Sequence, residues 1–240
     1  MHPHRSRKKS RRSISVRAFT TFAIALLTAI SAVSAADVRG SIQAASDHAS
    51  AFEPQNTQQM RRFYWEEWTG FLEPKARPFD VAREVAVVLT GQGTPAAEQG
   101  ALRFHNGSLF PATVVLRAGQ TALLRNEDAC PYELFAEGNA ELPPVQTAPG
   151  QSRPLQFSAP GNWPLRDRNF PHVRGHLHVL SDLIARASVD PNGSFVFRGI
   201  EPGSYTIRVF HGSREVLPGR AVQVGDAKEV VIEPISLPKP

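Results

Sequence analysis

The chain has 240 residues, a formal net charge of +5 and one cysteine. Seven basic residues and no acidic residue fall within residues 1–35, so the rest of the chain holds 20 Lys and Arg against 22 Asp and Glu. Because residues 36–240 are nearly neutral, their charge gives no reason to expect nucleic-acid binding. A single cysteine excludes an internal disulfide, so the fold must be held by its apolar core.

Residues 1–35 have the pattern of a secretory signal. A basic head precedes the apolar run 18–30, and small residues follow that run. Cleavage after Ala35 or Ala36 fits the small-residue rule. A membrane anchor is the rival interpretation, although the run is short for a bilayer span, and residues 10–14 resemble a twin-arginine signal. We therefore expect an exported protein, periplasmic or extracellular, without stable membrane insertion after cleavage.

The next part of the chain predicts two strands around an aromatic segment. The chain has 20 Pro, 17 Gly and no long amphipathic period, which favours an all-β fold. Residues 37–43 and 84–90 predict strands. Between them, MRRFYWEEWTGF has aromatic residues four apart, which predicts one short helix near 58–69. Its aromatic face either packs on the sandwich or binds a sugar or a partner protein.

Residues 102–180 predict a series of short strands separated by Gly and Pro turns. The predicted strands cover 102–111, 113–117, 121–125, a run after the loop 126–137, and 155–157. Two alternating strands then follow, and they contain Trp163 and Leu165, and Leu177 and Val179.

After residue 180, hairpin signals dominate. Residues 187–189 and 194–197 flank the turn sequence DPNG, in which Pro fits the second position and Gly tolerates a left-handed backbone. Residues 203–210 alternate, with Tyr205, Ile207 and Val209 predicted to face inward. Two further strands are predicted at 221–224 and 229–233.

The segment 101–180 resembles the small blue-copper proteins, the cupredoxins. The matching stretches are HNGSLFP, AGQTALLRNED, YELFA, PGNWPLR and RGHLHV, in that order. The resemblance implies a Greek-key sandwich whose loops converge on a copper site with one thiolate and two imidazoles. The aligned ligand positions read Tyr132, Asp167, Phe170 and Val173, which supply none of those groups. The resemblance therefore implies a domain without copper, in which a hydrogen bond between Tyr132 and Asp167 ties the loops together.

Residues 187–231 resemble the carboxypeptidase-regulatory-like module, a small transthyretin-like β-sandwich. VDPNGSFVFRGIEPGSYTIRV matches the D-x-x-G-x-F…G-x-x-P-G-x-Y run of that module. Its usual opening strands are present earlier, as VRGSIQ and EVAVVLT. We therefore predict a sandwich split between 36–100 and 181–240, with the cupredoxin-like domain inserted at 101–180. Two domains in series are the alternative.

A metal site built from other residues is also possible. His176 and His178 are two apart, so on a strand they share one face. With His172, and with Cys130 or His105 nearby, they could hold copper or zinc. The simpler interpretation treats the histidines as strand residues, with His178 hydrogen-bonded at an edge, and Cys130 as a partly buried thiol.

No catalytic motif accompanies these features. The sequence has no Gly-x-Ser-x-Gly, no phosphate-binding glycine loop and no His-Glu-x-x-His, and residues 166–168 predict only a surface ion cluster. We predict an exported, non-enzymatic binding or structural protein with an unidentified protein or envelope partner. The alternative is a periplasmic copper-binding or electron-transfer protein with an atypical ligand set.

Overall fold

The structure is a computed structural model, which describes residues 35–44, 48, 50–52, 79–95 and 101–238. All of these residues belong to one compact unit. Residues 1–34 of the predicted signal and the helix predicted near 58–69 lie outside the described residues. Within the described residues, no helix is long and apolar enough to cross a membrane.

The regular secondary structure of the described residues consists of strands apart from one helical turn, so the predicted all-β class is confirmed. Their one helix is the single turn α2 (Val81–Glu84), which the sequence pattern did not indicate. Asp80 caps this turn, because its carboxylate accepts the amides of Ala82 (3.1 Å) and Arg83 (3.3 Å). The chain then passes directly into strand β2.

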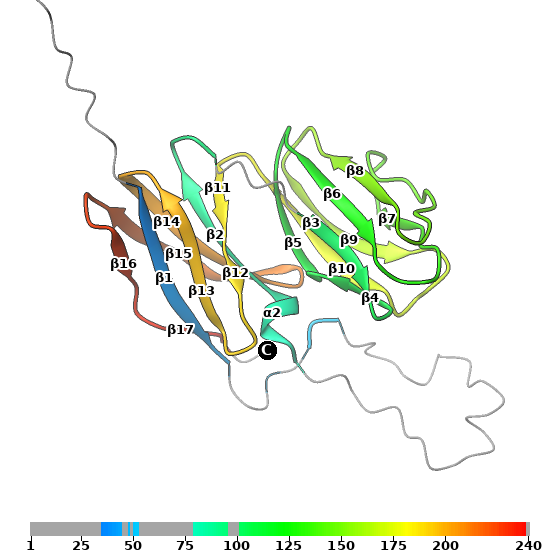
Figure 1. Ribbon diagram of the computed structural model, residues 1–240, viewed down its shortest axis with the longest axis horizontal. Helices are drawn as coiled ribbons and strands as arrows, with labels where there is room; N and C mark the ends of the chain where they lie inside the picture. The colour runs from blue at the N-terminus through cyan, green and yellow to red at the C-terminus, as the bar shows by residue number, and fades with distance from the viewer. Residues whose placement is uncertain (1–34, 45–47, 49, 53–78, 96–100, 239–240) are drawn as a thin grey trace, which may run out of the picture. The chain divides into compact units, whose positions relative to one another are not determined.

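Strands from both ends of the chain form one sandwich, which we call the terminal sandwich. One sheet has the order β12-β13-β1-β16, with β17 also paired to β1, and the other has the order β11-β2-β14-β15. Figure 1 shows β1, in blue, between β13 and the red β16. The bounds are β1 (Ala36–Gln43), β2 (Val85–Gly91), β11 (Leu183–Arg186), β12 (Ser188–Val189), β13 (Ser194–Ile200), β14 (Gly203–His211), β15 (Arg214–Val224), β16 (Glu229–Val231) and β17 (Ile235–Ser236).

The core of the terminal sandwich follows the alternation of its strands. Tyr205, Ile207 and Val209 of β14 are buried in it, as predicted. Val38 and Ile42 of β1 enter the same core, because β1 pairs antiparallel with β13. Residues from opposite ends of the chain are therefore packed together, and their burial removes a large apolar area from water.

The hairpin between β12 and β13 has the predicted turn. The amide of Gly193 donates to the carbonyl of Asp190 (2.9 Å), and the Asp190 carboxylate accepts the amides of Asn192 and Ser194. Gly193 has a φ of 84°, a conformation that glycine adopts without steric cost. The hairpin prediction is confirmed by the pairing of Val189 with Phe195.

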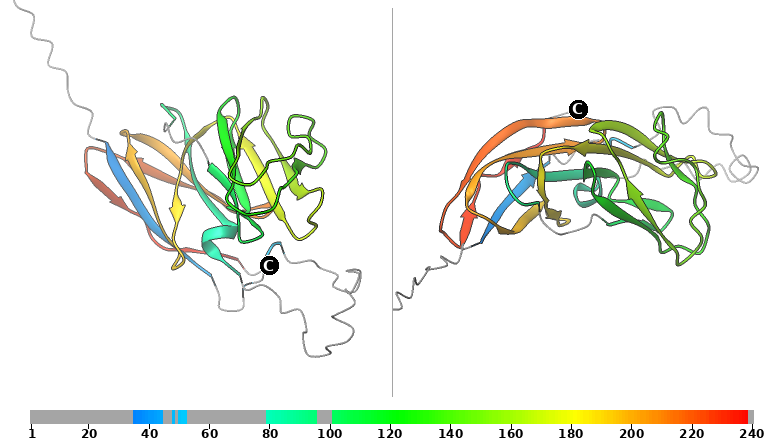
Figure 2. Two further views of the ribbon diagram at one scale, coloured as in Figure 1. Left: turned by 45° about the vertical axis from the view of Figure 1, so that its right-hand side comes forward. Right: turned by 90° about the horizontal axis from the view of Figure 1, so that it is seen from above.

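The middle of the chain forms the second sandwich, which we call the central sandwich. Its sheets have the orders β5-β10-β9-β7 and β4-β3-β6-β8. The chain crosses repeatedly between them, as in a Greek-key arrangement, and the views in Figure 2 show these strands mostly in green and yellow. The bounds are β3 (Ala101–His105), β4 (Ser108–Phe110), β5 (Thr113–Arg117), β6 (Thr121–Asn126), β7 (Leu134–Ala136), β8 (Ser152–Gln156), β9 (Gly161–Asp167) and β10 (Arg174–Leu180).

Candidate functional site

Tyr132 lies at the loop end of the central sandwich, just before β7. Its ring is buried and stacks on Phe104, with ring centroids 4.0 Å apart. Its hydroxyl donates to the Asp128 carboxylate (2.8 Å). Burial raises the pKa of Tyr132, and hydrogen bonds with Cys130 and Asp128 raise this pKa further. The phenol therefore stays protonated at physiological pH and acts as a donor.

Asp128 joins this loop to the turn between β3 and β4. Its carboxylate accepts the amides of Asn106 (2.7 Å) and Gly107 (3.0 Å) in addition to the Tyr132 hydroxyl. Burial would raise the pKa of Asp128, but these hydrogen bonds outweigh it and lower the pKa. Asn106 and Gly107 both have positive φ, as a two-residue hairpin turn requires.

Asp167 is buried and bound to backbone, which corrects two predictions. One carboxylate oxygen accepts the amide of Glu133 (2.6 Å), and the other accepts the amides of Asn169 and Phe170 (2.9 Å each). Asp167 therefore belongs to no surface ion cluster, because its charge is used to organise a turn. The predicted hydrogen bond from Tyr132 to Asp167 is also wrong, since Tyr132 donates to Asp128. The tie between the two loops is the Glu133 amide.

Phe170 and Val173 complete the set of aligned ligand positions, and both are apolar contacts. Val173 is fully buried in the core of the central sandwich, and Phe170 packs against that core. The Phe170 ring lies 5.3 Å from the ring of Tyr132. The loops thus bring Tyr132, Phe170 and Val173 into one core, and the Glu133 amide joins Asp167 to the Tyr132 loop. Phenol, carboxylate, phenyl and isopropyl groups do not fit a centre that requires a thiolate and two imidazoles.

The alternative ligand set is only partly brought together. Cys130 is half-buried next to the Tyr132 hydroxyl, and the ring of exposed His172 contacts that of Phe170 (5.9 Å). His176 and His178 are buried side by side on β10, with ring centroids 4.9 Å apart. Among the described residues, no group of three or more His, Cys, Asp or Glu side chains is arranged to hold a metal ion.

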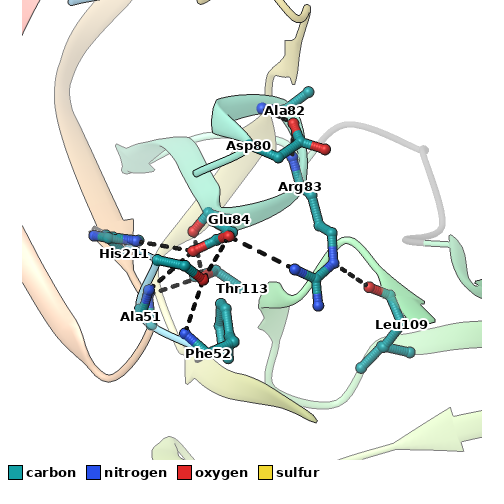
Figure 3. A network of polar contacts seen from close by, with 11 residues as sticks. Ala51, Phe52, Asp80, Ala82, Arg83, Glu84, Leu109, Thr113 and His211 are labelled. Carbon is teal, nitrogen blue, oxygen red and sulfur yellow. Dashed lines mark hydrogen bonds and ion pairs between the residues drawn. The ribbon is translucent and has the colours of Figure 1, made fainter. Parts of the chain in front are cut away.

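A second polar site lies where the two sandwiches meet, and we call it the junction. Its centre is Glu84, which is fully buried at the end of α2 (Figure 3). The Glu84 carboxylate accepts the Ser50 hydroxyl (2.8 Å) and the Ala51 amide (2.9 Å), and it lies 3.3 Å from Nε2 of His211 and 3.6 Å from the Arg83 guanidinium. Burial would raise the pKa of Glu84, but the contacts with His211, Ser50, Ala51 and Arg83 outweigh it and lower the pKa.

Hydrogen bonds between side chains and the backbone at the junction connect the two sandwiches directly. The Thr113 hydroxyl of β5 donates to the carbonyl of Glu84 and accepts the amide of Gly212 (2.9 Å), which lies between β14 and β15. The Arg83 side chain donates to the carbonyl of Leu109 (3.2 Å), as Figure 3 shows. A small apolar cluster lies beside these contacts and consists of Val88, Val115, Leu183 and Phe210.

Sequence reasoning did not find the junction. The sequence pattern predicts Glu84 as the first residue of a strand, whereas the structure places it at the end of α2, and the pattern assigns no role to His211. The signal is absent from local sequence, because Glu84 and His211 are 127 positions apart and meet only through the pairing of β2 with β14. His178 was expected to form a hydrogen bond at an edge, and its Nε2 lies 2.8 Å from the carbonyl of Gly212.

Comparisons with known proteins concern the fold only. No protein-family model matches the sequence, and no curated protein gives a significant match. Among solved structures, this chain is similar to amicyanin from Paracoccus versutus, at 16% identity over 39% of this chain and 97% of that chain, with a TM-score of 0.31. It is also similar to an oxidized amicyanin mutant, at 16% identity over 40% of this chain and 99% of that chain, with a TM-score of 0.32. Likeness at this level carries no argument about the candidate site.

Proposed function

We propose that this protein is an exported, non-enzymatic binding or structural protein whose central sandwich is a cupredoxin-like domain without a copper site. The observation that carries the proposal is the environment of Asp167. Both of its oxygens accept backbone amides, three in all, at the position that the sequence aligns with the copper thiolate. A carboxylate held in this way stabilises the loops itself.

The neighbouring side chains support the same proposal. The Tyr132 phenol, whose pKa is raised, donates to Asp128 and is not available as a phenolate ligand. Val173 is packed in the apolar core, where a metal ion would lose its hydration without gaining ligands. In this proposal, hydrogen bonds and apolar packing join the loops that a metal ion joins in a blue-copper site.

We further infer that the central sandwich is inserted between early and late strands of the terminal sandwich. The pairing of β1 with β13 and of β2 with β14 supports this inference, because β1 and β2 precede the central strands and β13 and β14 follow them. Such an arrangement places both ends of the inserted segment on the same host domain. In such a protein, the terminal sandwich can hold the central sandwich in position for a binding partner.

Copper titration of the mature protein tests the proposal. Isothermal titration with Cu²⁺ should give no site tighter than exposed histidines provide, and the copper-loaded sample should lack an intense thiolate-to-copper absorption band. Cys130→Ser should leave the titration unchanged, with His105→Ala as the control for an exposed imidazole. A stoichiometric copper complex with an intense visible band, lost in Cys130→Ser, would overturn the proposal.

The alternative is a copper-binding protein with an atypical ligand set, and one observation favours it. His176 and His178 lie side by side, and imidazole nitrogens bind copper readily. On this alternative, the same titration gives one equivalent of copper that is lost in His176→Ala and retained in His105→Ala.

A further inference from the structure

The buried histidines of the described chain are all gathered at the junction. Six histidines are described, and His105 and His172 of these are exposed on the central sandwich. The other four, at positions 48, 176, 178 and 211, are buried where the two sandwiches meet. Histidine is the side chain whose ordinary pKa lies closest to physiological pH, so buried imidazoles can make a contact sensitive to mild acid.

His176 and His178 occupy the contact itself. They lie on one face of β10, and they are only 8% and 5% exposed. The ring of His178 packs on Phe210 (4.5 Å), and its Nε2 lies 2.8 Å from the carbonyl of Gly212 in the turn after β14. Nε2 of His176 is buried and has no hydrogen-bond partner among the described residues. If that nitrogen carried a proton, its N–H group would have no hydrogen-bond acceptor while the junction is closed.

The charges that face this pair do not compensate a proton on His176. Arg166 of β9 and the other histidine are the groups that act on it, and both oppose a positive charge. His178 faces Arg208 of β14, which is already ion-paired with Glu215 of β15 (2.6 Å). The Glu84 carboxylate is occupied by His211, Ser50, Ala51 and Arg83. Nε2 of His211 lies 3.3 Å from the Glu84 carboxylate.

We propose that protonation of His176 and His178 opens the junction between the two sandwiches while both sandwich cores stay folded. The apolar clusters show why the junction yields first. The buried apolar cluster at the junction has four residues, whereas the two sandwich cores contain 18 and 17. Apolar burial therefore stabilises each sandwich far more than it stabilises their contact.

The direction of the effect follows from proton binding. Burial, with His178 and Arg166, lowers the pKa of His176 to about 4, and burial lowers the pKa of His178 despite its contact with Gly212. In the open form both imidazoles regain a pKa near 6.5. The closed form thus binds fewer protons, so its full stability is present above about pH 6.5 and declines as the pH falls toward 4. A shift of this size in His176 alone favours opening by on the order of a hundredfold.

Hydrogen exchange at single amides tests the proposal. The reporters are the amides of Ala112, which donates to the carbonyl of Arg83, and of Gly212, which donates to the Thr113 hydroxyl, because each of these bonds crosses the junction. The references are amides of β6 and β13, which lie in the two cores. After correction for the intrinsic pH dependence of exchange, protection at the reporters should fall at least tenfold between pH 7.5 and pH 5, while protection at the references is unchanged.

Substitutions connect that loss to the two imidazoles. His176→Gln combined with His178→Gln removes both titrating groups and should abolish the tenfold loss, whereas His105→Gln combined with His172→Gln should retain it. Equal loss in reporters and references, no loss down to pH 4.5, or an unchanged loss in the His176/His178 variant would each overturn the proposal. If that variant does not fold, ring-nitrogen NMR of the wild type decides. Protonation of His176 must accompany the loss of protection, and a His176 that protonates above pH 6 in a closed junction contradicts the proposal.

Discussion

The hydroxyl group of Tyr132 donates to the carboxylate of Asp128 at 2.8 Å, within the loop between β6 and β7. Asp128 also accepts the amides of Asn106 and Gly107, so one carboxylate organises three donors. The ring of Tyr132 is fixed independently by stacking on Phe104. The hydroxyl can therefore be removed without moving the ring.

Tyr132→Phe should lower the free energy of unfolding by about 1 kcal/mol, because Asp128 loses a donor while the ring stays packed. The loss should be seen at pH 7 and should vanish as the pH falls through the lowered pKa of Asp128, because a protonated carboxyl no longer attracts the phenol as strongly. Urea unfolding at pH 7 and at a pH below the lowered pKa of Asp128 measures both. Tyr205→Phe is the matched control, since its hydroxyl donates to the carbonyl of Glu201, which does not titrate. An equal loss at both pH values for Tyr132→Phe would contradict the role of Asp128.

Asp167→Asn should lower the free energy of unfolding by about 2 kcal/mol. The substitution removes the charge and places an NH₂ group against backbone amides that need an acceptor. Asp190→Asn is the control, because Asp190 accepts two amides from an exposed turn and solvent can replace it. Urea denaturation compares the two variants. A cost for Asp167→Asn no larger than that for Asp190→Asn would show that the buried turn does not depend on the carboxylate.

Most strands of both sandwiches could be predicted from sequence, because their information is local, but β11, β17 and residues 214–220 of β15 were not predicted. Alternation in β14 and the turn residues between β12 and β13 are read directly from neighbouring positions. The environment of Asp167 could not be predicted in this way. Its neighbours Arg166 and Arg168 suggest a surface cluster, whereas they pair with Glu137 and Glu133 while Asp167 turns inward.

The junction escaped prediction for a different reason. Glu84, Thr113 and His211 belong to three strands or turns that meet only after both sandwiches have formed. No local sequence pattern indicates that a carboxylate and a histidine are buried together when they are far apart in the chain. Propensity also gave no indication of α2, a single turn held by its cap and by its tertiary contacts.

Glu84→Gln should lower the midpoint of thermal unfolding at pH 7 and should have a smaller effect at a pH below the lowered pKa of Glu84. The carboxylate has a lowered pKa, so its contribution to stability is present above the ordinary pKa of glutamate and is lost as the pH falls through the lowered value. The amide keeps the contact with Ser50 but loses the charge that His211 and Arg83 face, which costs about 3 kcal/mol for a buried pair. Glu215→Gln, at the more exposed ion pair with Arg208, is the control. A similar midpoint for both variants at pH 7 would rule out Glu84 as the centre of the junction.

The mature protein should begin at Ala36 or Asp37, if residues 1–35 act as an export signal. Intact-mass measurement on protein recovered from the cell envelope checks this. Ala36 is already the first residue of β1 and is fully buried, so cleavage after Ala35 would leave the strand complete. A recovered mass that includes residues 1–35 would favour the membrane-anchor interpretation.

Gly40 in β1 tests the pairing of early and late strands in the terminal sandwich. A Cβ atom at this position would lie 2.6 Å from the ring of Phe195 and 2.6 Å from the side chain of Ile232. Phe195 comes from β13, which follows the central sandwich, so the close contact exists only if β1 pairs with strands from the end of the chain. Glycine is needed here for the close approach of these side chains.

Gly40→Ala should therefore lower the free energy of unfolding by about 2 kcal/mol, since the methyl group overpacks the core and displaces Phe195 or Ile232. Gly225→Ala is the matched control, because no atom lies within 4 Å of its Cβ position, and it should change stability by less than about 0.5 kcal/mol. A smaller side chain at position 195 should relieve the overpacking. The loss of unfolding free energy in Gly40→Ala combined with Phe195→Leu should therefore be smaller than the sum of the losses in the two single variants. Additive effects in that double-mutant cycle would mean that Gly40 and Phe195 do not touch, and the proposed insertion would lose its support from β1.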